Sequence, residues 1–133
     1  MTKPVILCVD DERMVLDSLK TQLQDSFGNS YLYEVAEDAE EALEVIQEFR
    51  EDEISILLIV SDWLMPGMKG DEFLIRVHQE FPNIIKILLT GQADESAIQR
   101  AKDRANLHCC LLKPWSKEEL IETIKSGLDK SDP

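Results

Sequence analysis

Residues 54–62 read Ile-Ser-Ile-Leu-Leu-Ile-Val-Ser-Asp, an apolar run that ends on an acid. A run this apolar, rich in β-branched residues and leucine, is typical of a strand whose two faces are both covered. We therefore expect Ile54–Val60 to form a central strand of a parallel sheet. Asp62 would then follow the carboxyl end of that strand, and Pro66 with Gly67 would supply the next turn.

Four further short apolar runs are expected to be strands. They are Pro4–Val9, Tyr31–Ala36, Ile84–Leu89 and Cys109–Leu112. Between the runs, apolar residues recur at helical spacing, as in Leu16, Leu19 and Leu23. Regular alternation of strand and helix with short loops predicts right-handed crossovers and a parallel sheet layered by helices. We predict an α/β fold, a doubly wound (βα)5 sandwich around a five-stranded parallel sheet.

Local signals give this sheet an edge and give two helices their starts. Tyr31–Ala36 is more polar than the other runs, which an edge strand tolerates. Asp38 with Glu41, and Ser116 with Glu119, have the spacing of a capping box, so a helix should begin at each pair.

The segment Asp94–Ala105 is helical by propensity but has one large apolar residue, Ile98. Its other apolar positions are alanines. We expect its contact with the core to be thin, which would make it the helix most able to shift.

Length and composition indicate one domain. The chain has 133 residues, of which 44% are hydrophobic, enough for a packed core. No internal repeat or long linker divides it, so we treat 1–133 as one domain with a core of about 4–129. The chain is either a stand-alone domain or one domain of a longer protein.

Charge and cysteine usage limit the partners. With 14 Lys and Arg against 27 Asp and Glu, the net charge is −13, which repels nucleic acid and anionic membranes. No apolar stretch approaches the roughly 20 residues needed to span a bilayer. The three cysteines, Cys8, Cys109 and Cys110, lack metal-binding spacing and lie in apolar runs. These features favour a protein of the reducing cytoplasm with no direct contact to nucleic acid or membrane.

Polar groups follow the carboxyl ends of four of the expected strands. They are Asp10 and Asp11, Asp62, Thr90 and Lys113. Parallel strands gather such groups in one crevice. Three acids, a hydroxyl and an ammonium in one pocket are the components of a magnesium-assisted site that accepts a phosphoryl group.

Each group has an expected role and an ordinary alternative. Asp11 and Asp62 suit direct ligation of Mg²⁺, with Asp10 acting through water, although the adjacent pair could instead cap a helix. A carboxylate beside a metal can accept a phosphoryl group, which makes Asp62 the candidate acceptor. Lys113 can carry its ammonium into the acid cluster, although a lone lysine is usually exposed. Thr90 alone is weak evidence, because threonine is common in strands.

In this pattern the chain resembles the receiver domain of two-component response regulators over nearly its whole length. The matching motifs are Asp10-Asp11, Asp62, Met65-Pro66-Gly67, Thr90 and Lys113-Pro114, in the order and at the spacing of that family. The resemblance implies a flavodoxin-like fold with strand order 2-1-3-4-5.

The resemblance also implies a mechanism and partners. Asp62 would take a phosphoryl group from a sensor histidine kinase or a phosphotransfer protein, with Mg²⁺ held by Asp11, Asp62 and the Leu64 backbone carbonyl. A cis peptide bond before Pro114 would aim Lys113 into the site. Movement of Thr90 would switch the face made by the fourth helix, fifth strand and fifth helix toward an output domain or effector protein. The chain would be a signalling switch, and a phosphorylation-dependent dimer stays open.

One position departs from the family pattern. Where receivers often carry an aromatic residue three positions before the lysine, this chain has Cys110. The aromatic swing is then absent or replaced, and a thiol sensor at Cys109 and Cys110 is a less favoured reading than a structural cysteine.

Two other functions fit the sequence less well. An aspartyl-phosphate phosphatase generally carries a second Asp two residues after its nucleophile, where this chain has Leu64, and that argues against it. A degenerate receiver that acts only by binding proteins would not need Thr90 or Lys113.

Overall fold

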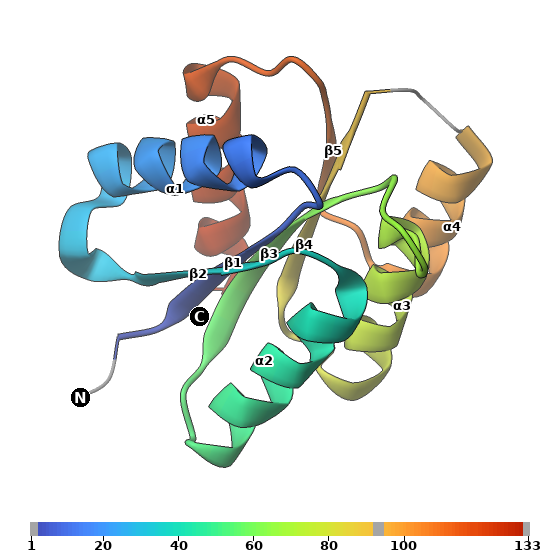
Figure 1. Cartoon of the computed structure of the whole chain (residues 1–133), viewed down its shortest axis with the longest axis horizontal. Helices are drawn as coiled ribbons and strands as arrows, with labels where there is room; N and C mark the ends of the chain where they lie inside the picture. The colour runs from blue at the N-terminus through green and yellow to red at the C-terminus, as the bar shows by residue number, and fades with distance from the viewer. Residues whose placement is uncertain (1–2, 92–94, 132–133) are drawn as a thin grey trace.

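The computed structural model describes residues 3–91 and 95–131 (Figure 1). Its sheet has five parallel strands in the order β2-β1-β3-β4-β5. The strands are β1 (Val5–Val9), β2 (Leu32–Ala36), β3 (Ile56–Asp62), β4 (Ile85–Thr90) and β5 (Cys109–Leu112). The predicted α/β class, the five-stranded parallel sheet and the strand order are confirmed, as are the central place of β3 and the edge place of β2.

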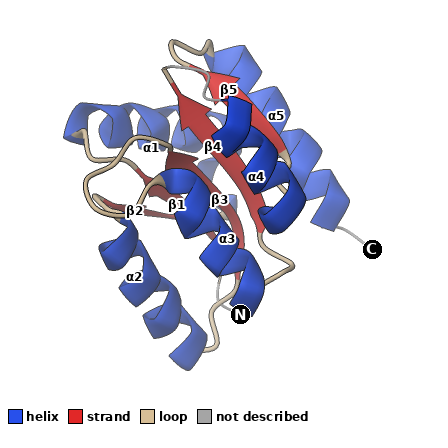
Figure 2. Cartoon of the chain, turned by 90° about the vertical axis from the view of Figure 1, so that its right-hand side faces the viewer, coloured by secondary structure: helices blue, strands red, loops and turns tan. Residues whose placement is uncertain are grey.

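Five α-helices connect and cover the strands. They are α1 (Arg13–Phe27), α2 (Ala39–Glu51), α3 (Gly70–Glu80), α4 (Glu95–Ala105) and α5 (Lys117–Ser131), with the short 3₁₀ helix η1 (Gly28–Ser30) after α1. Helices α1 and α5 lie on one face of the sheet, and α2, α3 and α4 lie on the other (Figures 1 and 2). Within the described residues, no helix combines the length and apolar character needed to cross a membrane.

The alternation of side chains along each strand divides the core into two layers. In β3, Ile59 packs with α2 and α3, whereas Leu58 and Val60 pack with α1 and α5. All three side chains have no exposed surface. This two-sided burial explains why the run is apolar at successive positions and not at alternate ones.

Two strands extend further toward the carboxyl edge than the apolar pattern indicates. β3 continues through Ser61 and Asp62, because these residues still pair with Leu88 and Leu89 of β4. β4 likewise includes Thr90, which pairs with Leu112. Asp62 and Thr90 are therefore the last residues of their strands. Pairing with the neighbouring strand fixes their backbone, so they are not the first residues of loops.

Both predicted helix starts are confirmed, but only the capping box at α5 is complete. The Glu41 N–H donates to Asp38 Oδ1 at 2.8 Å, and the Glu41 carboxylate accepts from the neighbouring Glu37 N–H at 3.4 Å. At α5 the exchange is reciprocal: the Glu119 N–H donates to Ser116 Oγ at 3.1 Å, and the Ser116 N–H donates to Glu119 Oε1 at 3.2 Å.

Helix α4 contributes small side chains to the core. Ala97, Ala101 and Ala105 are buried, and Ile98 packs against the core only in part. The expected first residue of this helix, Asp94, lies outside the described residues. The expectation that α4 is the helix most able to shift stays a prediction.

Candidate phosphoryl-acceptor site

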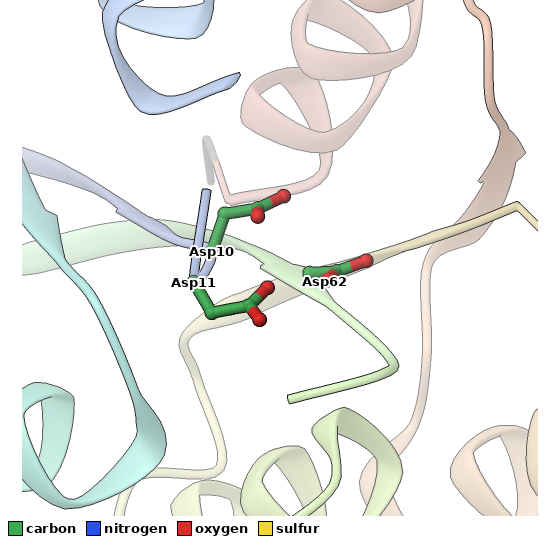
Figure 3. A group of neighbouring side chains, drawn as sticks. All are labelled: Asp10, Asp11 and Asp62. Carbon is green, nitrogen blue, oxygen red and sulfur yellow. The ribbon is translucent and has the colours of Figure 1, made fainter. Parts of the chain in front are cut away.

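Three carboxylates meet at the carboxyl edge of the sheet. Asp10 and Asp11 follow β1, and Asp62 ends β3 (Figure 3). One oxygen from each lies within 4.8 Å of the others. Asp10 and Asp62 are buried, at 0% and 5% exposure, whereas Asp11 is exposed. The three carboxylates offer the hard oxygen ligands that a divalent cation prefers, and the exposed Asp11 leaves the cluster accessible from solvent. The donor set therefore fits Mg²⁺.

Lys113 brings an ammonium into this cluster from the end of β5. Its Nζ lies 3.0 Å from Asp62 Oδ1 and 3.2 Å from Asp10 Oδ2. Its backbone N–H donates to the Thr90 carbonyl at 2.9 Å, and the Lys113–Pro114 peptide bond is cis. The side chain therefore points into the acid cluster, whereas a lone lysine at a strand end usually points into solvent.

The electrostatics of the cluster favour added positive charge. Burial raises the pKa of Asp62, and its hydrogen bond to Lys113 only partly opposes that rise. Burial raises the pKa of Asp10 in the same way, against a hydrogen bond from the Glu12 N–H and the charge of Lys113. One ammonium among three carboxylates leaves a net negative charge in a partly desolvated site, which a divalent cation would offset.

Lys113 is held in its charged form. Burial lowers its pKa, but the hydrogen bond and charge of Asp62, followed by Asp10, outweigh that effect and raise the pKa above its usual value. A lysine in this state is a permanent cation at neutral pH, suited to holding an anionic oxygen.

Both oxygens of Asp10 are engaged. Oδ1 accepts from the Glu12 N–H at 2.9 Å, and Oδ2 pairs with Lys113. Asp10 thus closes a turn onto Glu12, the N-cap residue of α1, but it does not cap the first turn of that helix. The carboxylates of Asp11 and Asp62 have fewer contacts with the rest of the protein. Among the described residues, the one ion-pair partner of Asp62 is Lys113.

The remaining predicted residues surround this centre. Thr90 is 2% exposed at the end of β4. Leu64 lies in the loop directly after Asp62 with 61% of its surface exposed, and the buried Met65 anchors that loop in the core. The exposed apolar side chain of Leu64 supplies no acid near Asp62.

Cys110 lies on the face covered by α2, α3 and α4. It pairs with Leu88 in the ladder and is partly buried against that core layer. Burial raises its pKa, with the neighbouring Cys109 adding to the rise. A raised pKa disfavours the thiolate, so these features support a structural cysteine over a thiol sensor.

Sequence reasoning missed a set of contacts around Trp63, the residue after Asp62. The indole Nε1 donates to Asp71 Oδ1 at 3.0 Å, and Arg100 of α4 donates to Asp71 Oδ2 at 2.6 Å. Asp71 lies in the first turn of α3, where an acid is expected for helix stability alone, so its sequence position gave no signal of these partners.

Gly70 allows α3 to approach this loop closely. A Cβ at this position would overlap the Asp62 carbonyl oxygen and lie 2.8 Å from the Trp63 Cα. Its N–H donates to the Trp63 carbonyl at 2.7 Å. The amino end of α3 is thus packed directly on the backbone of the candidate acceptor.

Comparison with known proteins identifies the family. The family model described as "Response regulator receiver domain" matches residues 6–125. The chain is 31% identical over 124 residues to the hydrogenase transcriptional regulatory protein HoxA of Cupriavidus necator, covering 93% of this chain and 24% of HoxA. It is 34% identical over 128 residues to the response regulator MprA of Mycobacterium leprae, covering 96% of this chain and 52% of MprA.

A solved structure agrees with both. The signal receiver domain of an HD domain-containing protein from Pseudomonas fluorescens Pf-5 superposes with a TM-score of 0.87 at 30% identity, covering 97% of each chain. This chain spans about a quarter of the length of HoxA and about half of the length of MprA. The family match, the relatives and the shared fold lead to one conclusion: the chain belongs to the response regulator receiver domain family of two-component systems.

Proposed function

We propose that Asp62 accepts a phosphoryl group from the phosphohistidine of a sensor histidine kinase or phosphotransfer protein, and that the chain is a signalling switch. The observation that carries the proposal is the convergence of Asp10, Asp11 and Asp62 on one point, with Lys113 within 3.2 Å of two of them. Family membership supports the same reading.

The transfer can be written with this chain's own groups. An Asp62 carboxylate oxygen forms a bond to phosphorus while the phosphorus–nitrogen bond breaks, and its electron pair returns to the imidazole of the partner's histidine. Asp62 becomes an acyl phosphate, and the ion pair with Lys113 passes to a phosphoryl oxygen. Thr90, at the neighbouring strand end, would donate a hydrogen bond from its hydroxyl to another phosphoryl oxygen.

Hydrolysis resets the switch. The oxygen of a water molecule bonds to phosphorus while the bond to the Asp62 oxygen breaks. Inorganic phosphate leaves with one of the water protons, the other passes to solvent, and the Asp62 carboxylate is restored. Leu64 provides no side-chain acid or base for this step, so the chain is proposed as a switch and not as a phosphatase of small substrates.

Asp11, Asp62 and the Leu64 backbone carbonyl would hold Mg²⁺, with Asp10 acting through water. The three converging carboxylates support this assignment, because Mg²⁺ takes one or two carboxylates and keeps several waters. Bound there, Mg²⁺ would offset the negative charge of the acids and of the incoming phosphoryl oxygens.

Output would use the face made by α4, β5 and α5. Thr90 ends β4 and pairs with Leu112 of β5, so a shift of Thr90 toward the phosphoryl group would reach this face directly. An output domain or effector protein in the cytoplasm would read the change. The relatives named transcriptional regulatory protein and response regulator are longer chains, which supports an output partner of that kind.

The test is the intact mass after incubation with a small phosphodonor and Mg²⁺. We expect wild type to gain one base-labile phosphoryl group, and Asp62→Asn, or wild type in EDTA, to gain none. Asp17→Asn, an exposed acid on α1, is the matched control and should behave as wild type. Absence of any adduct on wild type would favour the degenerate receiver.

A further inference from the structure

Three consecutive residues at the start of α3 contact Trp63. The Gly70 N–H donates to its carbonyl at 2.7 Å, Asp71 accepts its indole N–H at 3.0 Å, and the Lys69 ammonium lies 5.1 Å from the centre of its ring. The Trp63 N–H donates to the Leu89 carbonyl at 2.8 Å. The residue that follows the candidate acceptor is therefore fixed by both its backbone and its side chain.

Asp71 joins this residue to α4. Its two oxygens have different partners: Oδ1 accepts from Trp63, and Oδ2 accepts from Arg100 at 2.6 Å. The Asp71 side chain is 3% exposed and that of Arg100 is 48% exposed. A carboxylate buried this deeply destabilises the fold unless both hydrogen bonds are kept. A displacement of Trp63 should therefore shift Asp71 and, through it, Arg100, and the reverse should also hold.

We propose that Asp71 is a positioning residue that couples the loop after Asp62 to helix α4, through Trp63 on one carboxylate oxygen and Arg100 on the other. The inference rests on the proposed function, since it states how occupancy of the Asp62 site reaches α4. It is a second route beside that of Thr90.

The composition of α4 gives this bridge a large share in holding the helix. The buried side chains of α4 are the alanines Ala97, Ala101 and Ala105, which offer little apolar surface. A charge-assisted hydrogen bond to a buried carboxylate is among the stronger polar contacts a protein makes. On this proposal, helix α4 would follow a movement of Asp71.

Reciprocity makes the coupling measurable from the far end. If the site and α4 are coupled, a change made on α4 must alter the affinity of the site for its cation. Arg100→Gln, on an exposed side of the molecule, should then weaken Mg²⁺ binding. Long-range electrostatics predicts the opposite sign, because removing a positive charge favours a bound cation.

The experiment uses the full chain with Trp115→Phe, so that Trp63 is the only remaining tryptophan of two. Mg²⁺ titrations followed by Trp63 fluorescence give the Kd, and the indole N–H resonance of Trp63 reports its bond to Asp71. We expect Arg100→Gln to raise the Kd about three- to tenfold and to shift this resonance. Arg104→Gln, an exposed arginine one turn along α4, is the matched charge control and should leave the resonance unchanged, with an equal or lower Kd.

The outcomes separate this inference from the function on which it rests. The coupling is overturned if Arg100→Gln leaves the Kd unchanged, lowers it, or gives the same Kd as Arg104→Gln. The contact between Asp71 and Arg100 would then only stabilise the packing of α3 against α4. Asp71→Asn should raise the Kd at least as much as Arg100→Gln does. A wild type that shows neither Mg²⁺ binding nor a phosphoryl adduct would overturn the proposed function, and this inference with it.

Discussion

Lys86 lies within β4 with 1% of its surface exposed. Its ammonium donates to the Ile84 carbonyl at 2.7 Å and to His78 Nδ1 at 3.0 Å. Burial lowers the pKa of Lys86 to about 8, and burial followed by the charge of Lys86 lowers the pKa of His78. The imidazole is therefore neutral near pH 7 and can accept the hydrogen bond, while the lysine remains charged at a cost.

Because of this buried lysine, the stability of the protein should vary with pH in the alkaline range. The unfolded chain keeps the Lys86 proton up to its ordinary pKa, whereas the folded chain releases it near 8, so the free energy of unfolding should rise with pH between these values. We expect wild type to gain about 2 to 3 kcal/mol relative to Lys86→Met between pH 7 and pH 10.5. Urea unfolding of both proteins across this range measures the difference, and parallel curves would contradict the expected titration.

Lys86 and Lys113 show what single residues could reveal from sequence. Lys113 follows an apolar run, next to Pro114, where a strand end places its side chain at the crevice, and the structure shows it there. Lys86 sits inside an apolar run with no neighbour that marks its partners. His78 lies on helix α3, so the pair exists only once α3 packs on β4.

At the scale of elements, the reciprocal capping box at α5 supports a quantitative prediction. Ser116→Ala removes the oxygen that accepts the Glu119 N–H at 3.1 Å, and should lower the free energy of unfolding by about 1 kcal/mol. Ser116→Asp keeps an acceptor at the same place and should retain most of the stability. Urea unfolding of the two variants checks this, and equal losses in both would contradict the cap as the cause.

Elements were predictable where a local pattern determines them, and less so where tertiary pairing does. Both helix starts were visible in the sequence, because the pairs Asp38 with Glu41 and Ser116 with Glu119 act within one turn. The ends of β3 and β4 were not, because pairing with the neighbouring strand extends them onto the polar residues Asp62 and Thr90. The bridge from α3 to α4 through Asp71 depends on packing between helices and has no local pattern.

At the scale of the whole molecule, alternation of apolar runs with helical periodicity was sufficient for the fold class. The strand order came only from the family resemblance, because periodicity does not say which strands are neighbours. The grouping of Asp10, Asp62 and Lys113 followed from a general property of parallel sheets, whose strand ends meet at one edge. The contacts of Trp63 lie beyond that rule, since they depend on how closely Gly70 allows α3 to approach.

The charge of the whole molecule leads to a prediction for Mg²⁺. The chain carries a net charge of −13, and Asp10, Asp11 and Asp62 concentrate part of it at one point. Any cation will relieve the general repulsion, but only one held by the cluster stabilises the folded state by mass action. At Mg²⁺ about ten times its Kd, that stabilisation is about 1.4 kcal/mol, or a rise in Tm of about 4 °C.

The two effects separate when MgCl₂ is compared with KCl at equal ionic strength. We expect wild type to melt at a higher temperature in MgCl₂, and Asp11→Asn to lose most of that excess because it removes the exposed ligand while leaving the buried pair. Asp11→Asn should also melt above wild type in KCl, since one of three neighbouring negative charges is gone. Equal melting temperatures of wild type in the two salts would leave general screening as the only effect and would contradict a metal site at these acids.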